Sequence, residues 1–273
     1  MSELKLTISV VIYKSTLSEL EPLFQSLCAL RSTAICVVDN FGDAILKNEV
    51  LKNGWGYLSI GRNLGYGKGH NLAYSWLSGF GAEFHLVVNP DVSFLPSDIE
   101  KMLTYIGNNE DVGLLMPQVR FPDGHIQRLC KMLPTPVDLL ARRFLPSMPC
   151  LNSMSSRYDL ANWSYNEIAD IPVLSGCFML LRKKAFDGVG GFDPGYFMYL
   201  EDTDLCRRIG ARWINCFYPE ASITHAYAKG SYKSKKLLFF HVASSVRYFF
   251  KWGWFLDSYR KTRNARAKRE LLL

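Results

Sequence analysis

Apolar and polar positions alternate along the N-terminal third of the chain in a way that predicts strands and helices in turn. Residues 7–13 form a compact apolar, β-branched run, which is typical of a strand buried on both faces. Residues 15–30 carry leucine and phenylalanine at helical spacing, and residues 34–38 repeat the strand pattern before Asp39 and Asn40. Strand, helix and strand in this order predict a βαβ unit, and therefore a parallel sheet with a right-handed crossover.

The same alternation continues toward the C-terminus, with one irregular stretch. Residues 121–166 contain five prolines and little periodicity, so we expect a long insertion over the site, with a short helix near residues 137–144. Further strands are predicted at residues 57–60, 83–88, 113–116, 171–181 and 213–218. Further helices are predicted at residues 69–77, 96–106, 183–189, 199–209 and 235–254. The chain is thus predicted to be an α/β protein.

Polar side chains follow the first two predicted strands. Ligands of open α/β sheets collect at the carboxyl ends of the strands, which places Tyr13, Lys14, Asp39 and Asn40 on a binding rim. Asp39 could accept a hydrogen bond from a nucleobase or a ribose. The alternative is that Asp39 caps a turn or a helix, which is a common use of aspartate.

The tripeptide Asn89, Pro90 and Asp91 directly follows another predicted buried strand. A carboxylate at a strand's carboxyl end could hold a divalent ion such as Mg²⁺ or Mn²⁺, because hard ions prefer oxygen ligands and share them with substrate phosphates. The alternative is a strand-ending turn, for which the same residue types are favoured. The tripeptide alone leaves both readings open.

Residues 62–71 form a glycine-rich segment ahead of a predicted helix, with glycine at positions 65, 67 and 69. Glycine lets the backbone approach a ligand closely, and a helix N-terminus favours phosphate. The spacing matches neither the dinucleotide fingerprint GxGxxG nor a P-loop, so a plain mobile loop is an equal alternative.

Three acids, Glu201, Asp202 and Asp204, precede an apolar helical turn. They could simply complement the helix dipole. On a helix, however, position 202 points away from the face shared by positions 201 and 204, so one carboxylate can project into a cleft. A carboxylate placed there suits a general base that deprotonates an acceptor hydroxyl. His225 follows a later strand, and a lone histidine is more often structural than a ligand.

Taken together, the motifs occur in a familiar order. The matching segments are residues 9–15, 37–40, 63–71, 89–91, 175–178 and 190–204, followed by His225, and the most specific are VVNPDV and GGFDPGYFMYLEDTDLCRR. Over roughly residues 7–232 the chain resembles the bacterial family 2 inverting glycosyltransferases. It is most similar to the rhamnosyltransferase subgroup that builds O-antigen and related surface polysaccharides.

This resemblance implies a GT-A fold, a single Rossmann-like α/β domain with a mixed, mainly parallel sheet. The domain would occupy residues 1–232, and residues 233–273 would form a basic, aromatic-rich helical extension. The donor-binding residues implied are Tyr13 and Asp39 at the nucleobase, with Asn63, Gly65, Gly67 and Asn89 beside the rest of the donor.

The resemblance also implies a metal site. Asp91 matches the last acid of the family's DXD element and would hold Mg²⁺ or Mn²⁺ against the diphosphate, while His225 would complete the metal shell. Asn89 stands where the family has the first acid. Because asparagine brings no charge, the ion would depend on the substrate's own phosphates, and a metal-poor mechanism stays open.

By the same resemblance, Asp202 would be the catalytic base. It would take the proton of the acceptor hydroxyl as that oxygen attacks the anomeric carbon opposite the leaving nucleotide, which inverts the configuration. Glu201 would orient the acceptor or the base, and Ser175, Gly176 and Tyr199 would contact the acceptor.

The donor favoured by the resemblance is dTDP-L-rhamnose, and the acceptor is a lipid-linked glycan of lipopolysaccharide synthesis. A UDP-hexose such as UDP-galactose or UDP-N-acetylglucosamine is the alternative donor, since no motif indicates which sugar the donor carries. A non-catalytic glycan-assembly subunit of the same fold is a further alternative. Such a subunit is expected to lose Asp91 or the acids at 201 and 202, and this chain keeps them all.

The charge of the chain is concentrated at its C-terminus. Residues 226–273 contain twelve Lys or Arg and two acids, a local charge of +10 within a total of +7, and aromatic residues interleave with them. This composition suits a helix lying on an anionic inner-membrane surface. The alternative is an amphipathic helix packed on the domain. Nucleic acid is not expected as a partner, because no recognised binding module accompanies the basic residues.

The cysteine pattern and the N-terminal residues indicate the cellular compartment in which the protein is expected. The seven cysteines include no CxxC pair, which favours a reducing cytosol. The apolar run that follows the first five residues is too short for a signal sequence or a membrane span. We therefore expect a cytoplasmic protein that is peripheral on the inner face of the cell membrane.

Overall fold

One twisted sheet of nine strands organises the protein. The computed structural model describes residues 6–141, 157–226 and 235–272. The strands follow the spatial order β3-β2-β1-β4-β8-β6-β9-β5, and β7 also pairs with β9. The strands are β1 (Leu6–Ile12), β2 (Thr33–Asp39), β3 (Gly56–Leu58), β4 (Phe84–Val88), β5 (Val92–Phe94), β6 (Val112–Arg120), β7 (Ala169–Asp170), β8 (Phe178–Arg182) and β9 (Ile214–His225).

Strand directions divide the sheet into two parts. Strands β1 to β4 are parallel to one another, as the βαβ pattern predicts. Strand β8 then runs antiparallel to both of its neighbours, β4 and β6. Beyond it, β6 and β9 are parallel, while β5 and β7 pair antiparallel with β9. The sheet is therefore mixed, with six of its nine strands running in one direction, and β8 begins at the edge where the first parallel strands end.

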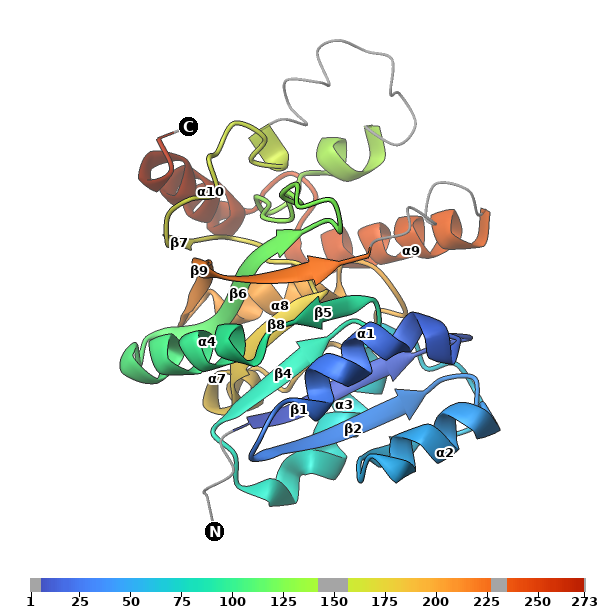
Figure 1. Ribbon diagram of the computed structural model, residues 1–273. Helices are drawn as coiled ribbons and strands as arrows, with labels where there is room; N and C mark the ends of the chain where they lie inside the picture. The colour runs from blue at the N-terminus through green and yellow to red at the C-terminus, as the bar shows by residue number, and fades with distance from the viewer. Residues whose placement is uncertain (1–5, 142–156, 227–234, 273) are drawn as a thin grey trace.

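Helices cover both faces of the sheet. In Figure 1, α1 and α4 lie on the near face, whereas α3, α7 and α8 lie behind the strands. The helices are α1 (Leu17–Cys28), α2 (Ala44–Lys52), α3 (Tyr66–Trp76), α4 (Pro96–Asn108), α7 (Lys183–Gly188), α8 (Glu201–Ile209), α9 (Lys235–Trp252) and α10 (Ser258–Glu270), with the short helices η1 (Leu77–Phe80) and η2 (Val137–Ala141).

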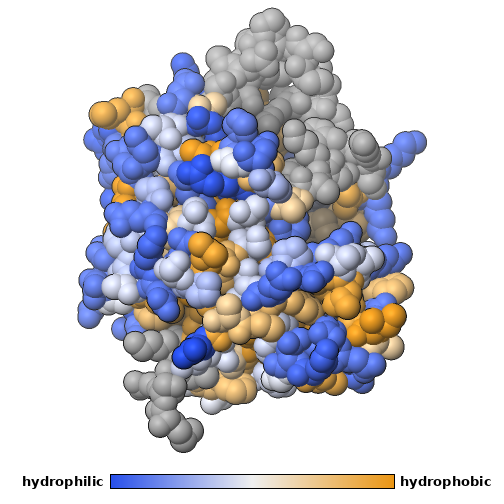
Figure 2. Space-filling model, in the orientation of Figure 1, coloured by the Kyte–Doolittle hydropathy of each residue, from blue (hydrophilic) through white to orange (hydrophobic). Residues whose placement is uncertain are grey.

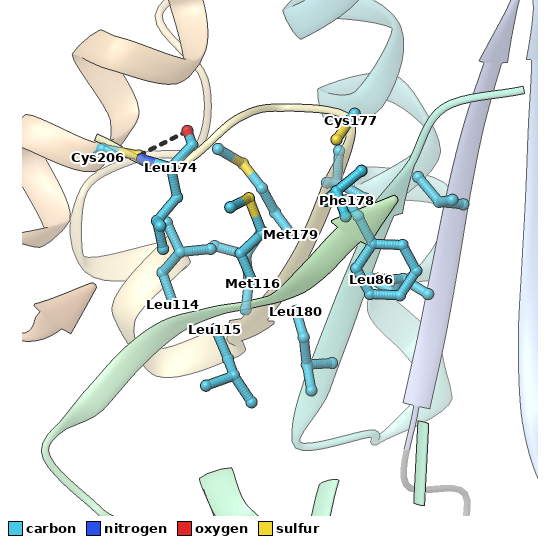
Figure 3. Close-up of a cluster of buried hydrophobic side chains, with 14 of the residues drawn as sticks. Leu86, Leu114, Leu115, Met116, Leu174, Cys177, Phe178, Met179, Leu180 and Cys206 are labelled. Carbon is cyan, nitrogen blue, oxygen red and sulfur yellow. Dashed lines mark hydrogen bonds between the residues drawn. The ribbon is translucent and has the colours of Figure 1, made fainter. Parts of the chain in front are cut away.

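The central strands supply the core. Every residue of β4 and β8 is buried, and β6 is buried up to its last residue. Figure 3 shows their side chains interdigitating with Leu174, whose carbonyl accepts a hydrogen bond from the Cys206 thiol of α8. Each large apolar side chain buried in this way contributes about 1.5–3 kcal/mol. This packing fixes α8 against the sheet and so positions the acids at its start.

The two C-terminal helices pack on the domain. The aromatic side chains of Tyr248 and Phe249 in α9 are fully buried. Asp257, which caps α10, receives two hydrogen bonds from the guanidinium of Arg207 in α8, at 2.6 and 2.7 Å, and both side chains are buried. Arg263 of α10 pairs with Asp170 of β7 at 2.5 Å. Arginine–aspartate pairs therefore help to hold α10 in place, in addition to apolar contact.

Most predicted elements are present, with several differences in extent. The predicted strand 171–181 is a loop up to residue 177, and β8 begins only at Phe178. Strand β9 continues to His225 rather than ending at residue 218. The structure adds five elements that the pattern did not predict, α2, η1, β5, β7 and α10. The predicted helix 137–144 is described only as η2, and the predicted boundary between residues 232 and 233 lies outside the described residues.

Candidate active site

A turn after β4 and a loop before β8 meet at one edge of the sheet. Strands β4 and β8 pair antiparallel with Val88 opposite Phe178, so the residues just beyond them are neighbours. The backbone N–H of Asn89 donates to the carbonyl of Cys177 at 2.9 Å. The segment Asn89, Pro90 and Asp91, where a metal site is predicted, is thereby joined to residues 175–177. These include two predicted acceptor residues, Ser175 and Gly176.

Strand pairing also brings Asp91 and His225 together. Strands β5 and β9 run antiparallel with Val92 opposite His225, and the N–H of Ala226 donates to the Asp91 carbonyl at 2.8 Å. As a result, Nε2 of His225 lies 3.2 Å from Oδ1 of Asp91. The imidazole is almost fully buried, while the carboxylate is about one-third exposed. Two residues that are 134 positions apart in sequence thus form one polar corner.

This corner suits a divalent ion that is shared with a substrate. Oδ1 of Asp91 is buried and makes no hydrogen bond within the described residues, and it points at an imidazole nitrogen. Among the residues that the structure describes, no three His, Cys, Asp or Glu side chains gather into a metal-binding group. Asp91 and His225 could therefore supply two ligands, and substrate phosphates and water would have to supply the others, as is common for Mg²⁺ and Mn²⁺.

Asp202 lies on the other side of residues 175–177. Its Oδ2 accepts a hydrogen bond from the Gly176 N–H at 3.1 Å, and its Oδ1 accepts one from the Thr203 N–H at 2.7 Å. The residue occupies the first turn of α8, where the helix dipole favours a negative charge. The carboxylate is half-buried, so it is held firmly and still reaches the surface of the site.

The neighbouring acids have different surroundings. Asp204 is fully buried, and its oxygens pair with Arg208, Lys251 and the Trp252 indole N–H at 2.7–2.8 Å, so its role is to anchor α8. Glu201 is also buried, and its Oε2 makes no hydrogen bond within the described part of the chain. Burial, and then the nearby charge of Asp202, raise the pKa of Glu201 to about 8.

Tyr66 contacts the same segment as Asp202 does, at Gly176. Its hydroxyl donates a hydrogen bond to the Gly176 carbonyl. Burial and the nearby acidic groups of Cys177, Glu201, Asp202 and Asp91 raise the pKa of Tyr66 well above its usual value. The same hydroxyl therefore lies within electrostatic reach of both predicted catalytic acids and the predicted metal ligand. The sequence motifs did not single out Tyr66, although it lies inside the glycine-rich segment.

The backbone just before α8 is strained. Tyr199 and Leu200 have φ values of 71° and 63°, in the left-handed region that side chains other than glycine rarely adopt. Each such residue costs about 1–3 kcal/mol, and such strain concentrates at functional sites. Here it turns the chain sharply so that Glu201 and Asp202 begin the helix at the edge of the sheet. Tyr199, a predicted acceptor residue, is half-buried and its ring lies 5.4 Å from that of His241 in α9.

The predicted nucleobase rim carries exposed aromatic residues. The rings of Tyr13 and Phe41 meet edge to face at 6.3 Å, and the Lys14 ammonium lies 5.6 and 5.4 Å from their centres. Figure 2 shows hydrophobic side chains gathered at the right-hand edge, where Figure 1 places the ends of β1 and β2. Phe41, which follows β2, and Ile45 of α2 are both exposed. An exposed aromatic pair can stack on a base. Phe41 was not singled out from the sequence.

Asp39 organises the loop that follows β2. Its oxygens accept hydrogen bonds from the N–H groups of Phe41 and Asp43 and from the Tyr57 hydroxyl, each at 2.8 Å. Burial alone would raise the pKa of Asp39, but these hydrogen bonds outweigh it and hold the pKa below its usual value. The structure thus gives Asp39 the turn-capping role that was the alternative reading, and a contact with the donor stays a prediction.

The glycines of the predicted donor loop are required by close packing. A Cβ on Gly65, whose φ is 83°, would lie 2.1 Å from the Phe197 carbonyl oxygen, and one on Gly67 would lie 2.9 Å from the Phe192 side chain. Asn63 accepts a hydrogen bond from the Gly65 N–H at 2.8 Å. Both glycines are buried against the segment that precedes α8. Contact of Asn63, Gly65 and Gly67 with a donor stays a prediction.

Comparisons with known proteins place these features in context. No protein-family model matches the chain. It is 30% identical over 200 residues to an N-acetylglucosaminyl-diphospho-decaprenol L-rhamnosyltransferase of Mycobacterium tuberculosis, covering 69% of this chain and 65% of that protein. It is 25% identical over 213 residues to a low-salt glycan biosynthesis hexosyltransferase of Haloferax volcanii, covering 77% of this chain and 63% of that protein. The chain thus spans just under two thirds of each relative.

A solved structure gives independent support for the architecture. GalNAc-T7, crystallised with UDP, GalNAc and Mn²⁺, superimposes with a TM-score of 0.63 at 14% sequence identity, over 100% of this chain and 52% of that one. This likeness confirms the predicted fold class, a mixed α/β domain with a helical C-terminal segment.

The buried Glu201 carboxyl should make stability depend on pH. Its folded-state pKa lies above its ordinary value, so between about pH 4.5 and 8 the folded protein keeps a proton that the unfolded chain releases. The unfolding free energy of the wild type should therefore fall relative to that of Glu201→Gln as pH rises through this window, by on the order of 5 kcal/mol in total, and then level off. Urea unfolding of both proteins at pH 5, 6.5 and 8.5 measures this difference in unfolding free energy.

The matched control for this experiment is Glu220→Gln, because Glu220 is exposed. Its unfolding free energy should follow that of the wild type at every pH. Parallel curves for Glu201→Gln and the wild type would contradict the assignment of a buried, proton-retaining carboxyl.

Proposed function

We propose that this chain, which belongs to the family 2-like GT-A glycosyltransferases, transfers a sugar from a nucleotide donor to an acceptor hydroxyl with inversion. The observation that carries the proposal is the arrangement around residues 175–177. The Asp91–His225 corner is hydrogen-bonded to one end of this segment through Asn89, and Asp202 to its middle. A site for a diphosphate and a site for a base are thereby held side by side, as a single displacement requires.

Asp91 and His225 would hold a divalent ion, Mg²⁺ or Mn²⁺, at the diphosphate. When bound, the ion would offset the negative charge that develops on the leaving nucleotide. The names of the two relatives state no metal, but the structural neighbour GalNAc-T7 was crystallised with UDP and Mn²⁺. Tyr13 and Phe41 would stack beside the nucleobase at the far end of the donor.

Asp202 would act as the general base. As the acceptor oxygen forms its bond to the anomeric carbon, its proton passes to an Asp202 oxygen, and the bond from that carbon to the diphosphate breaks with its electron pair leaving on the nucleotide. Two N–H groups hold the carboxylate, so the base is pre-positioned. Glu201 keeps its proton near neutral pH, so it can donate a hydrogen bond that orients the acceptor or the base.

We infer dTDP-L-rhamnose as the donor and a lipid-linked glycan of surface polysaccharide synthesis, such as O-antigen, as the acceptor. The name of the mycobacterial relative supports L-rhamnose as the transferred sugar and a lipid-linked acceptor, because it specifies an L-rhamnosyltransferase and a diphospho-decaprenol sugar. A UDP-hexose is the second candidate, which the archaeal hexosyltransferase relative favours. Transfer assays with dTDP-L-rhamnose, UDP-galactose and UDP-N-acetylglucosamine onto a polyprenyl-diphosphate N-acetylglucosamine distinguish the two.

Replacing Asp202 by Asn tests the proposed reaction. The turnover number should fall by about 10²- to 10⁴-fold because the base is lost, whereas the donor dissociation constant should stay within about threefold. Donor binding is measured by calorimetry and transfer by product chromatography. The control is Asp187→Asn, an exposed residue whose hydrogen bond from the Tyr74 hydroxyl an asparagine can still accept. Retained turnover in Asp202→Asn would remove Asp202 from the role of base.

We further propose that α9 and the turn after it rest on the anionic inner face of the cell membrane. No helix in the described ranges is both long and apolar enough to cross a bilayer. Phe239 and Phe250 of α9 share one helix face and are 67% and 77% exposed, and Phe255 and Leu256 in the following turn are 80% and 96% exposed. Exposed lysines at 235, 236 and 261 accompany them. An apolar edge with basic neighbours suits a headgroup layer.

The double variant Phe255→Ser/Leu256→Ser tests membrane contact. Its affinity for liposomes of anionic lipid should be at least about tenfold weaker than that of the wild type, since two apolar side chains no longer enter the interface. Flotation with liposomes measures the bound fraction. The matched control is Ile45→Ser/Leu51→Ser, two exposed apolar residues of α2, which should float like the wild type. Equal flotation of both double variants would contradict the proposed surface.

A further inference from the structure

Gln127 contacts His225 on the side of the imidazole opposite Asp91. Residues 121–125 form a tight turn after β6, closed by the hydrogen bond from the Phe121 N–H to the His125 carbonyl at 2.8 Å. The chain then returns along β6, and the Gln127 N–H donates to the Val119 carbonyl at 2.8 Å. Gln127 is 3% exposed, and its Oε1 lies 2.9 Å from Nδ1 of His225.

The amide of Gln127 can face only one way. Its Nε2 donates to the backbone carbonyl of His225 at 2.6 Å and to that of Arg120 at 3.4 Å. Since both partners are carbonyl oxygens, an amide turned the other way would bring oxygen against oxygen. Oε1 therefore faces the imidazole, and as an amide oxygen it can only accept.

This orientation fixes the tautomer of the imidazole. Because Oε1 accepts, Nδ1 of His225 must carry the hydrogen. In the neutral ring the lone pair then belongs to Nε2, which is the atom 3.2 Å from the Asp91 carboxylate. Gln127 also holds the backbone carbonyl of the same histidine, so ring and main chain are fixed by one side chain.

We propose that Gln127 is a positioning residue that keeps the Nε2 lone pair of His225 directed at the divalent ion beside Asp91. This inference rests on the metal site of the proposed function. Partners of this kind orient metal-binding histidines and raise their basicity, and their loss typically costs 10- to 100-fold in metal affinity. The role differs from that of a merely structural glutamine, because it acts on the imidazole nitrogen opposite the ion.

The test compares Mn²⁺ binding by three variants, measured by electron paramagnetic resonance with dTDP present. Gln127→Met keeps the volume but loses the acceptor, so its Mn²⁺ dissociation constant should rise about 10- to 100-fold. Gln127→Glu keeps an acceptor oxygen at Nδ1, but its second oxygen faces the His225 and Arg120 carbonyls and can donate to them only when protonated, so its Mn²⁺ dissociation constant should lie between those of the wild type and Gln127→Met. The matched control is Gln118→Met, which removes a second buried glutamine, one that lies in β6 and whose amide donates to the Tyr165 carbonyl. It should bind Mn²⁺ as the wild type does.

The outcomes separate this inference from the proposed function. A wild type that binds no Mn²⁺ would contradict the metal site and this inference with it. A wild type that binds Mn²⁺, together with a folded Gln127→Met variant of equal affinity, would contradict the positioning role alone. Nitrogen chemical shifts of ¹⁵N-labelled His225 give a readout without metal. They should report hydrogen on Nδ1 in the wild type, and a mixture of tautomers in Gln127→Met would support the role.

Discussion

The antiparallel pairing of β8 with β4 is the constraint on which the candidate site depends. The parallel strands end at one edge of the sheet, and only a strand of opposite direction can begin there. Because Val88 lies opposite Phe178, the turn after β4 meets residues 175–177. These residues contact Asn89 on one side and Asp202 on the other through single hydrogen bonds. A shift of one residue in this register would turn the buried side chains of β8 to the other face.

Helix α9 supports the same site from outside. The Ser244 hydroxyl donates to the Met198 carbonyl at 2.8 Å, and the ring of Phe240 packs on Phe197 at 4.5 Å. These contacts brace the chain just before the two left-handed residues that start α8. An adjacent face of α9 carries the exposed Phe239 and Phe250. One helix thus links the proposed membrane surface to the loop that would receive a lipid-linked acceptor.

The sequence predicted what local pattern can encode. The βαβ unit, the buried central strands and the order of the polar motifs follow from periodicity and residue type, and the structure has the strands and helices on which these motifs depend. Local sequence could not predict that β5, with three residues, forms by pairing with β9, because the partner strand lies 130 residues away. Helix α10 escaped prediction because Arg260 and Arg263, rather than apolar residues, make up much of its buried face.

The roles of single residues were harder to predict than the elements. Asp39 and the two loop glycines look like ligand contacts in sequence, yet their nearest partners are Tyr57, Phe197 and Phe192. Tyr66, Phe41 and Gln127 carry no motif of their own and enter the site only through tertiary contact. The turn Pro122, Asp123, Gly124 was the one available signal that the chain would fold back and bring Gln127 to β9.

The central claim is that Asp91 and its neighbours bind the diphosphate of a nucleotide sugar together with a divalent ion. Thermal denaturation with dTDP-L-rhamnose and UDP-hexoses, with and without Mn²⁺, tests it most directly, because a ligand of the folded state raises the melting temperature. We predict that at least one nucleotide sugar stabilises the wild type more with Mn²⁺ than without, and that Asp91→Asn loses the Mn²⁺-dependent part. No stabilisation by any nucleotide sugar, or an unchanged Mn²⁺ response in Asp91→Asn, would contradict the account.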